Sequence, residues 1–314
     1  MLTYVLLAAG FFLLIKGADL FVDGSASVAK KLHVPSMIIG LTIVAMGTSA
    51  PECAVSISAS LKGSNAMAIS NVVGSNIFNL MVVCGCCALF APLAVHTKTL
   101  KQEYPFSILI AVLMLGLGYF GMSLSRWDGL ILVVIFVVFL IWMVKSAMKA
   151  RADHEGLEES EEEVRELGTL RCILYIIIGI IAIVLGGDLV VDSATEIARN
   201  FGLSENLIGL TIVAFGTSLP ELVTSIVAAR KGEVDMAFGN VIGSNIFNIL
   251  FVAGLAAVVS PMGFLMENVI DLVILIAMSI LVWSFATSKR KVSRLEGSFM
   301  LFLYAAYIVY ICNR

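Results

Sequence analysis

Two glutamates, Glu52 and Glu221, stand where an apolar sequence should cross a lipid bilayer. Each ends a hexapeptide, GTSAPE at 47–52 and GTSLPE at 216–221, that interrupts a long apolar run. A carboxylate near the centre of a bilayer is costly, so it is usually retained for function. The hexapeptides add hydroxyl oxygens and a helix-breaking proline, and they contain no basic residue and no histidine. Such oxygen-only surroundings favour a hard cation, Ca²⁺ or Na⁺.

The segment after each hexapeptide supplies further oxygen ligands. NVVGSNIFNL at 71–80 and NVIGSNIFNI at 240–249 place a serine four residues before an asparagine. This spacing puts both side chains on one face of a helix. Small and polar residues also pack membrane helices together, but packing does not explain a symmetric pair of glutamates. The sequence therefore predicts one cation site with these side chains: Glu52, Glu221, Ser49, Ser218, Ser75, Ser244, Asn79 and Asn248.

The composition is that of a polytopic helical membrane protein. Apolar residues make up 60% of the chain and charged residues 14%, with a mean hydropathy of +1.01. A soluble domain has about 45–50% apolar and about 25% charged residues. The net charge of −3 gives no basis for a nucleic-acid partner. The six cysteines show no disulfide or metal-binding pattern, so we expect no cofactor, and nothing implies an obligate protein partner.

The chain contains an internal repeat with a period of 169 residues. That shift aligns 40–80 with 209–249 without a gap, and 26 of the 41 positions are identical. Upstream, GADLFVD at 17–23 matches GGDLVVD at 186–192. Because the similarity extends over nearly the whole chain, we divide it into two halves joined by a charged segment.

Each half contains five apolar segments, so we predict an all-α membrane protein with ten transmembrane helices. Because five is odd, the second half must enter the membrane from the opposite side, which gives two inverted five-helix repeats. The expected organisation is a first five-helix repeat at 1–148, with α-repeat 1 at about 34–91; a cytoplasmic linker at 149–168; and a second five-helix repeat at 169–314, with α-repeat 2 at about 203–259.

The positive charges predict the orientation. With the N-terminus outside, 15 of the 20 Lys and Arg residues fall in loops on the inner side and four on the outer side. The positive-inside rule therefore places both termini outside and the 149–168 linker in the cytoplasm. We expect the protein in the cell membrane, with the lipid bilayer as its surroundings.

The duplicated GTSAPE…GSNIFN and GTSLPE…GSNIFN motifs resemble the two α-repeats of the calcium/cation antiporters, in the sodium/calcium exchanger branch. The resemblance covers essentially the full length of the chain. It implies ten transmembrane helices, inverted five-helix repeats and exchange of Na⁺ for Ca²⁺ at a central site. No long cytoplasmic regulatory domain separates the halves, because the linker has only about 20 residues.

The resemblance also implies which residues bind the transported ions. Glu52 and Glu221 are expected to bind Ca²⁺ directly, and hydroxyl and carbonyl oxygens to favour Na⁺ in flanking sites. Several exchangers of this family carry Asp at the position of Asn248, so this site has two carboxylates rather than three. The implied ligands are the Ala45 carbonyl, Thr48, Ser49, Glu52, Ser75 and Asn79, and the Ala214 carbonyl, Thr217, Ser218, Glu221, Ser244 and Asn248.

The sequence leaves three alternatives to Na⁺/Ca²⁺ exchange. A Ca²⁺/H⁺ antiporter is the nearest, because Glu52 and Glu221 could carry protons, although the three histidines fall in loops. A passive cation channel usually forms its filter from a ring of subunits, whereas an internal inverted repeat favours alternating access. A membrane enzyme is disfavoured because neither an HExxH nor a GxSxG motif is present.

Overall fold

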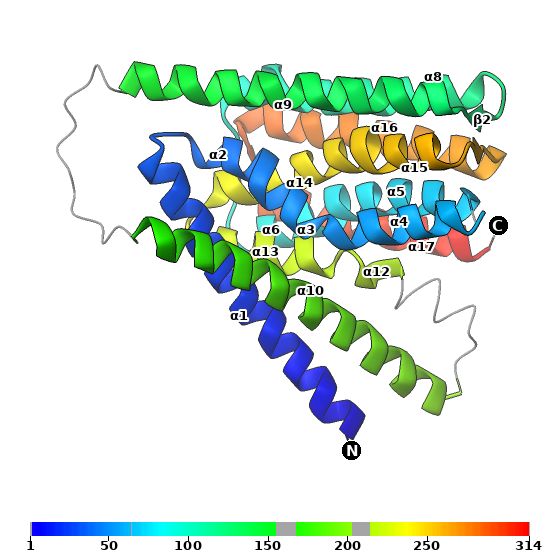
Figure 1. The fold of residues 1–314 in the computed structure, drawn as a ribbon, viewed down its shortest axis with the longest axis horizontal. Coiled ribbons are helices and arrows are strands. Elements are labelled where there is room, and N and C mark those ends of the chain that lie inside the picture. The colour runs from blue at the N-terminus through cyan, green and yellow to red at the C-terminus, as the bar shows by residue number, and fades with distance from the viewer. Residues whose placement is uncertain (1, 64, 155–167, 203–213, 314) are drawn as a thin grey trace.

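The computed structural model describes residues 2–63, 65–154, 168–202 and 214–313, and these residues are almost entirely helical (Figure 1). The first half contains α1 (Leu2–Lys31), α2 (Ser36–Ile39), η1 (Gly40–Val44), α3 (Ala45–Thr48), α4 (Ala50–Leu61), α5 (Asn65–Phe78), η2 (Asn79–Val83), α6 (Cys84–Phe90), β1 (Leu93–Ala94), α7 (Thr97–Lys101), α8 (Glu103–Tyr119), β2 (Ser123–Leu124) and α9 (Arg126–His154). The second half contains α10 (Thr169–Asn200), α12 (Ala214–Gly216), α13 (Leu219–Arg230), α14 (Val234–Phe247), η4 (Asn248–Ala253), α15 (Gly254–Val259), β3 (Met262–Gly263), α16 (Met266–Lys289), β4 (Lys291–Val292) and α17 (Arg294–Cys312). The elements labelled η are π-helical turns.

The described part of the chain contains eight helices that are long and apolar enough to cross a membrane. A ninth span is obtained if the bent pair Ser36–Thr48 and Ala50–Leu61 is counted as one. The sequence predicts ten; the segment expected to begin at residue 203 falls partly within 203–213, which lies outside the described residues. Residues 155–167 of the expected linker also lie outside them.

The protein exposes large apolar side chains on its outer faces and encloses polar groups within an otherwise apolar interior. The outward faces of α9 and α10 expose large apolar side chains such as Val138, Ile141, Ile177 and Ile181. The interior instead encloses carboxylate, amide and hydroxyl groups, including Glu52. An exposed apolar surface over long helices is stable in lipid, where each helix satisfies its own backbone hydrogen bonds.

Helices α1 and α10 pack closely against each other and run obliquely to the other long helices (Figure 1). A side chain on Gly17 would place its Cβ 2.9 Å from the carbonyl oxygen of Gly179, and one on Gly10 would place it 3.0 Å from that of Gly186. Position numbers fall along α10 as they rise along α1, so the two helices are antiparallel. Glycines therefore bring the two backbones into direct contact, as in other close pairs of membrane helices.

The two halves are interlocked at the centre and at the periphery. Almost all of α14 is buried, and its Gly243 lies against η1, where an added Cβ would be 2.6 Å from the carbonyl oxygen of Leu41. At the periphery β1 pairs with β4 and β2 with β3, both antiparallel, so each short ladder takes one strand from each half. These contacts hold the motif-bearing segments of the first half against those of the second half.

Candidate cation site

Both glutamates lie in the first turn of a helix that begins after a break. In the first half the break is at Ser49 (φ −83°, ψ 12°), and the helices before and after it are bent by 48°. Ser218 (φ −95°, ψ 7°) occupies the same place before α13. A proline is tolerated in the first helical turn because the N–H groups there have no partner within the helix. The helix N-terminus also favours a negative charge, so the local sequence creates a suitable position for Glu52 and Glu221.

Each carboxylate is bound by the serine of the other half. Ser49 Oγ donates to Glu221 Oε1 at 2.7 Å, and Ser218 Oγ donates to Glu52 Oε1 at 2.9 Å. Both glutamates are completely buried. Within the described part of the chain, Oε2 of each has no hydrogen-bond partner. One oxygen of each carboxylate is therefore held by a hydroxyl, and the other is available to a cation.

The two predicted asparagines, Asn79 and Asn248, each begin a π-helical turn, η2 and η4. Both are fully buried, and the oxygens of both amides are without a hydrogen-bond partner among the described residues. Ser75 and Ser244 lie one turn earlier and are also buried. π-Turns are rare and occur often at functional sites. The sequence gave no sign of the π-turns.

The remaining predicted ligands, Thr48, Thr217 and the carbonyls of Ala45 and Ala214, precede the two glutamates in the chain. Thr48 Oγ1 lies 3.1 Å from both the Val44 carbonyl oxygen and Asn240 Oδ1, and the Ala45 carbonyl accepts a 3.0 Å bond from the Ser49 N–H. Thr217 Oγ1 is buried, and no partner for it is found in the described ranges. Ala214 begins α12. The Ala45 carbonyl oxygen also lies 3.4 Å from Thr48 Oγ1, so it faces two donors in this structure.

Sequence reasoning missed two asparagines that support this arrangement. Asn71 Nδ2 donates to Ser56 Oγ at 2.9 Å, and Asn240 Nδ2 donates to Ser225 Oγ at 2.9 Å. The two bonds are related by the 169-residue repeat, and each ties the helix that carries the glutamate to the helix that carries the asparagine ligand. The sequence feature that could have identified them is the NV dipeptide, which begins both 71–80 and 240–249.

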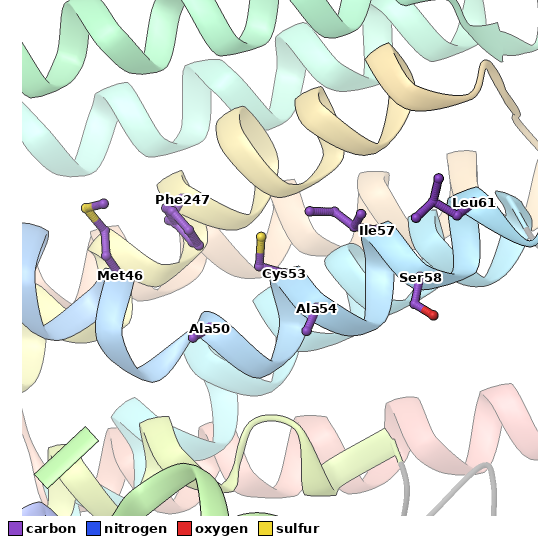
Figure 2. A pocket seen from close by; sticks show the side chains of 8 residues that line it. All are labelled: Met46, Ala50, Cys53, Ala54, Ile57, Ser58, Leu61 and Phe247. Carbon is purple, nitrogen blue, oxygen red and sulfur yellow. The ribbon is translucent and has the colours of Figure 1, made fainter. Parts of the chain in front are cut away.

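A cavity of about 500 Å³ lies beside α4, and none of the predicted cation ligands lines it (Figure 2). No carboxylate lines it, and in Figure 2 Cys53 points from α4 toward the side on which Phe247 lies, whereas Ser58 points to the other side. Its walls are Met46, Ala50, Cys53, Ala54, Ile57, Ser58, Leu61 and Phe247. One face of α4 therefore presents Glu52 to the buried polar cluster, and the opposite face is apolar.

The chain was compared with known proteins. The pattern of the sodium/calcium exchanger protein family matches residues 2–145 and 172–313. The chain is 39% identical to the putative antiporter CaxA of Alkalimonas amylolytica over 96% of each chain. It is 33% identical to the sodium/calcium exchanger MaX1 of Methanosarcina acetivorans, over 98% of this chain and 97% of that one. A solved structure of the sodium-calcium exchanger NCX_Mj, soaked with zero Na⁺ and Ca²⁺, superposes with a TM-score of 0.85 at 32% identity and covers 99% of both chains.

Proposed function

Because the chain belongs to the sodium/calcium exchanger protein family, we propose that it is a secondary active antiporter that exchanges Na⁺ for Ca²⁺ by alternating access. The observation that carries this proposal is the buried pair of glutamates, each bound on one oxygen by the serine of the other half and, among the described residues, without a hydrogen-bond partner on the other oxygen. Two carboxylates without a basic partner need a cation to compensate their burial. Carboxylate, hydroxyl, amide and carbonyl oxygens are ligands suited to Ca²⁺ and Na⁺.

Charge balance couples the two ions. Two carboxylates neutralise one Ca²⁺ or two Na⁺, and in either case the loaded site is close to neutral. Glu52 and Glu221 bind Ca²⁺ directly, and Na⁺ occupies flanking positions formed by the hydroxyls of Thr48 and Thr217 and the carbonyls of Ala45 and Ala214. The empty site carries two buried negative charges and crosses between the two orientations only at high cost. The ion-loaded site can therefore change orientation and exchange Na⁺ for Ca²⁺, whereas the empty site rarely does, so uncoupled movement of either ion is suppressed.

The proposed architecture is ten transmembrane helices in two inverted repeats, with both termini outside and the 149–168 linker in the cytoplasm. The close contact between α1 and α10, together with their oblique course (Figure 1), supports their movement as one unit against the other helices. Sliding of this pair would open the site to one side of the membrane at a time.

A Ca²⁺/H⁺ antiporter is the second candidate. It is favoured by one observation: each buried glutamate keeps one oxygen free of hydrogen bonds within the described residues, where a proton could be taken up in place of Na⁺. The site residues would be the same, and only the coupling ion would differ.

Transport measurements on the purified protein in liposomes distinguish a Na⁺/Ca²⁺ antiporter from a Ca²⁺/H⁺ antiporter. Na⁺-loaded liposomes diluted into Na⁺-free buffer with ⁴⁵Ca²⁺ should accumulate calcium, and the uptake should require the outward Na⁺ gradient. Liposomes with matched Na⁺ on both sides and an imposed pH gradient are the control. Uptake that follows the pH gradient and ignores Na⁺ would replace the sodium proposal with the proton antiporter.

A further inference from the structure

Two buried asparagines outside the predicted site, Asn76 and Asn245, face each other across the two halves. Asn76 Nδ2 donates to the Asn245 carbonyl oxygen at 3.2 Å, and Asn245 Nδ2 donates to the Asn76 carbonyl oxygen at 3.2 Å. They occupy equivalent positions in the repeat, on α5 and α14. The pair therefore joins the two helices that carry the asparagine ligands.

The backbone carbonyl fixes the orientation of the Asn76 amide. A carbonyl oxygen can only accept, so the NH₂ group of Asn76 must face the Asn245 carbonyl and its Oδ1 must point elsewhere. That Oδ1 lies 3.2 Å from the side-chain nitrogen of Asn248. Since Oδ1 also can only accept, Asn248 has to turn its own NH₂ group toward Asn76. The oxygen of Asn248 is left on the opposite side of the amide, where it is buried and has no partner among the described residues.

We propose that Asn76 is a positioning residue for the transported cation: its amide holds Asn248 so that Oδ1 is presented to the ion. This rests on the proposed function, because Asn248 belongs to the proposed site. An unbound buried acceptor is costly, and a cation removes that cost. Without Asn76, the Asn248 amide could rotate by half a turn and present NH₂, which repels a cation.

The same contact explains why an amide suits position 248. An aspartate there would bring a carboxylate oxygen against Asn76 Oδ1, so that two acceptors would face each other. Rotating the Asn76 amide would relieve this contact only by turning Oδ1 onto the Asn245 carbonyl. Asn76 therefore favours a neutral ligand at position 248 and a site with two carboxylates.

The link exists on one side only. The equivalent contact would join Asn245 to Asn79, but within the described residues Asn245 Oδ1 and both amide atoms of Asn79 are unpartnered. The Asn245 side chain thus contributes a buried hydrogen bond without orienting a ligand. Asn245→Ala is therefore a matched control for Asn76→Ala, because it removes one such bond and leaves the Asn76–Asn248 contact in place.

The test is Ca²⁺ binding to the purified protein by calorimetry, in detergent and without Na⁺. We expect Asn76→Ala to weaken binding roughly tenfold and Asn245→Ala to stay within about twofold of the wild type. Asn76→Ala should add almost nothing to Asn248→Ala, because Asn76 acts through Asn248. Asn248→Asp should bind Ca²⁺ more tightly when combined with Asn76→Ala than alone.

Asn76 would be only a packing residue if Asn76→Ala and Asn245→Ala weakened Ca²⁺ binding equally. The same would follow if the effects of Asn76→Ala and Asn248→Ala on Ca²⁺ affinity were additive. If Asn76→Ala does not fold, the Asn248→Asp comparison can be made with Asn76→Ser in its place. The binding measurement contains no Na⁺ gradient. If the wild type shows no Na⁺-driven uptake, the proposed exchange is overturned. The effect of Asn76→Ala on Ca²⁺ binding can still be measured and interpreted.

Discussion

The hydroxyl of Ser49 lies 2.7 Å from Oε1 of Glu221, a residue of the other half of the chain. Its repeat equivalent, Ser218, makes the reciprocal bond to Glu52 at 2.9 Å. Neither carboxylate is therefore completed by its own half. The proposed cation site therefore depends on both halves, and a change in how the halves meet would change both carboxylates at once.

The serine bonds can be tested by Ser49→Ala and Ser218→Ala. A hydrogen bond to a charged group contributes about 1.5–3 kcal/mol, so each substitution should weaken Ca²⁺ binding by roughly 10- to 100-fold. Ser58→Ala on the apolar face of α4 is the matched control, and it should bind Ca²⁺ as the wild type does. Calorimetry of the three variants gives the comparison, and equal affinity in all three would remove the serines from the site.

The glutamates are tested by Glu52→Gln and Glu221→Gln. Each change removes one of the two negative charges that compensate the cation, and losing one member of a buried charge pair costs about 3–5 kcal/mol. We expect ⁴⁵Ca²⁺ uptake to fall by at least about 100-fold. Glu267→Gln, at an exposed position at the start of α16, is the control and should transport normally. Uptake that survives both buried substitutions would place the ion elsewhere.

The contact between α1 and α10 is tested by Gly17→Leu. The new Cβ would lie 2.9 Å from the Gly179 carbonyl oxygen, so the two helices would have to separate. Overpacking of this kind costs about 1–3 kcal/mol, and we expect a lower thermal unfolding temperature together with slower uptake. Gly116→Leu is the control, since an added Cβ there meets nothing within 4 Å in the described structure. Similar unfolding temperatures and rates in both variants would contradict close packing of the pair.

An ion-pair cluster connects the C-terminal half of α1 to the residue that follows α13. Lys231 Nζ lies 2.8 Å from Asp23 Oδ1 and 3.4 Å from Asp19 Oδ1. The repeat equivalent of Lys231 is Lys62, which is exposed and makes no ion pair in the described part of the chain. Among the described residues, the ion-pair cluster is therefore present at Lys231 and has no counterpart at Lys62.

Lys231→Ala should shift the protein away from this conformation. Exposed ion pairs contribute at most about 1 kcal/mol, so the shift should not exceed roughly fivefold. In the proposed orientation it would strengthen apparent Ca²⁺ binding on the cytoplasmic face and weaken it on the outer face. Half-saturating Ca²⁺ in inside-out and right-side-out vesicles measures both, with Lys62→Ala as the comparison. An equal change on both faces would mean that the cluster does not distinguish the two orientations.

Much of the architecture follows from local sequence features. The apolar segments predicted the helices that the structure describes, because a helix in lipid needs about 20 apolar residues and little else. The helix ends were less predictable. The first apolar segment ends near residue 22, whereas α1 continues to Lys31, because a helix can extend beyond the lipid when its polar residues find partners. For Asp23 that partner is Lys231, more than 200 residues away.

The sequence by itself determined that the protein is helical and membrane-embedded, that its motif occurs twice at an interval of 169 residues, and that Glu52 and Glu221 are its exceptional residues. These features depend on composition, periodicity and the cost of a charge in lipid, which are readable along one chain. Only the tertiary structure decided that Ser49 binds the opposite glutamate and that Asn76 fixes the amide of Asn248. Spacing within a helix sets which side chains share a face, but the partner of that face depends on how separate helices dock.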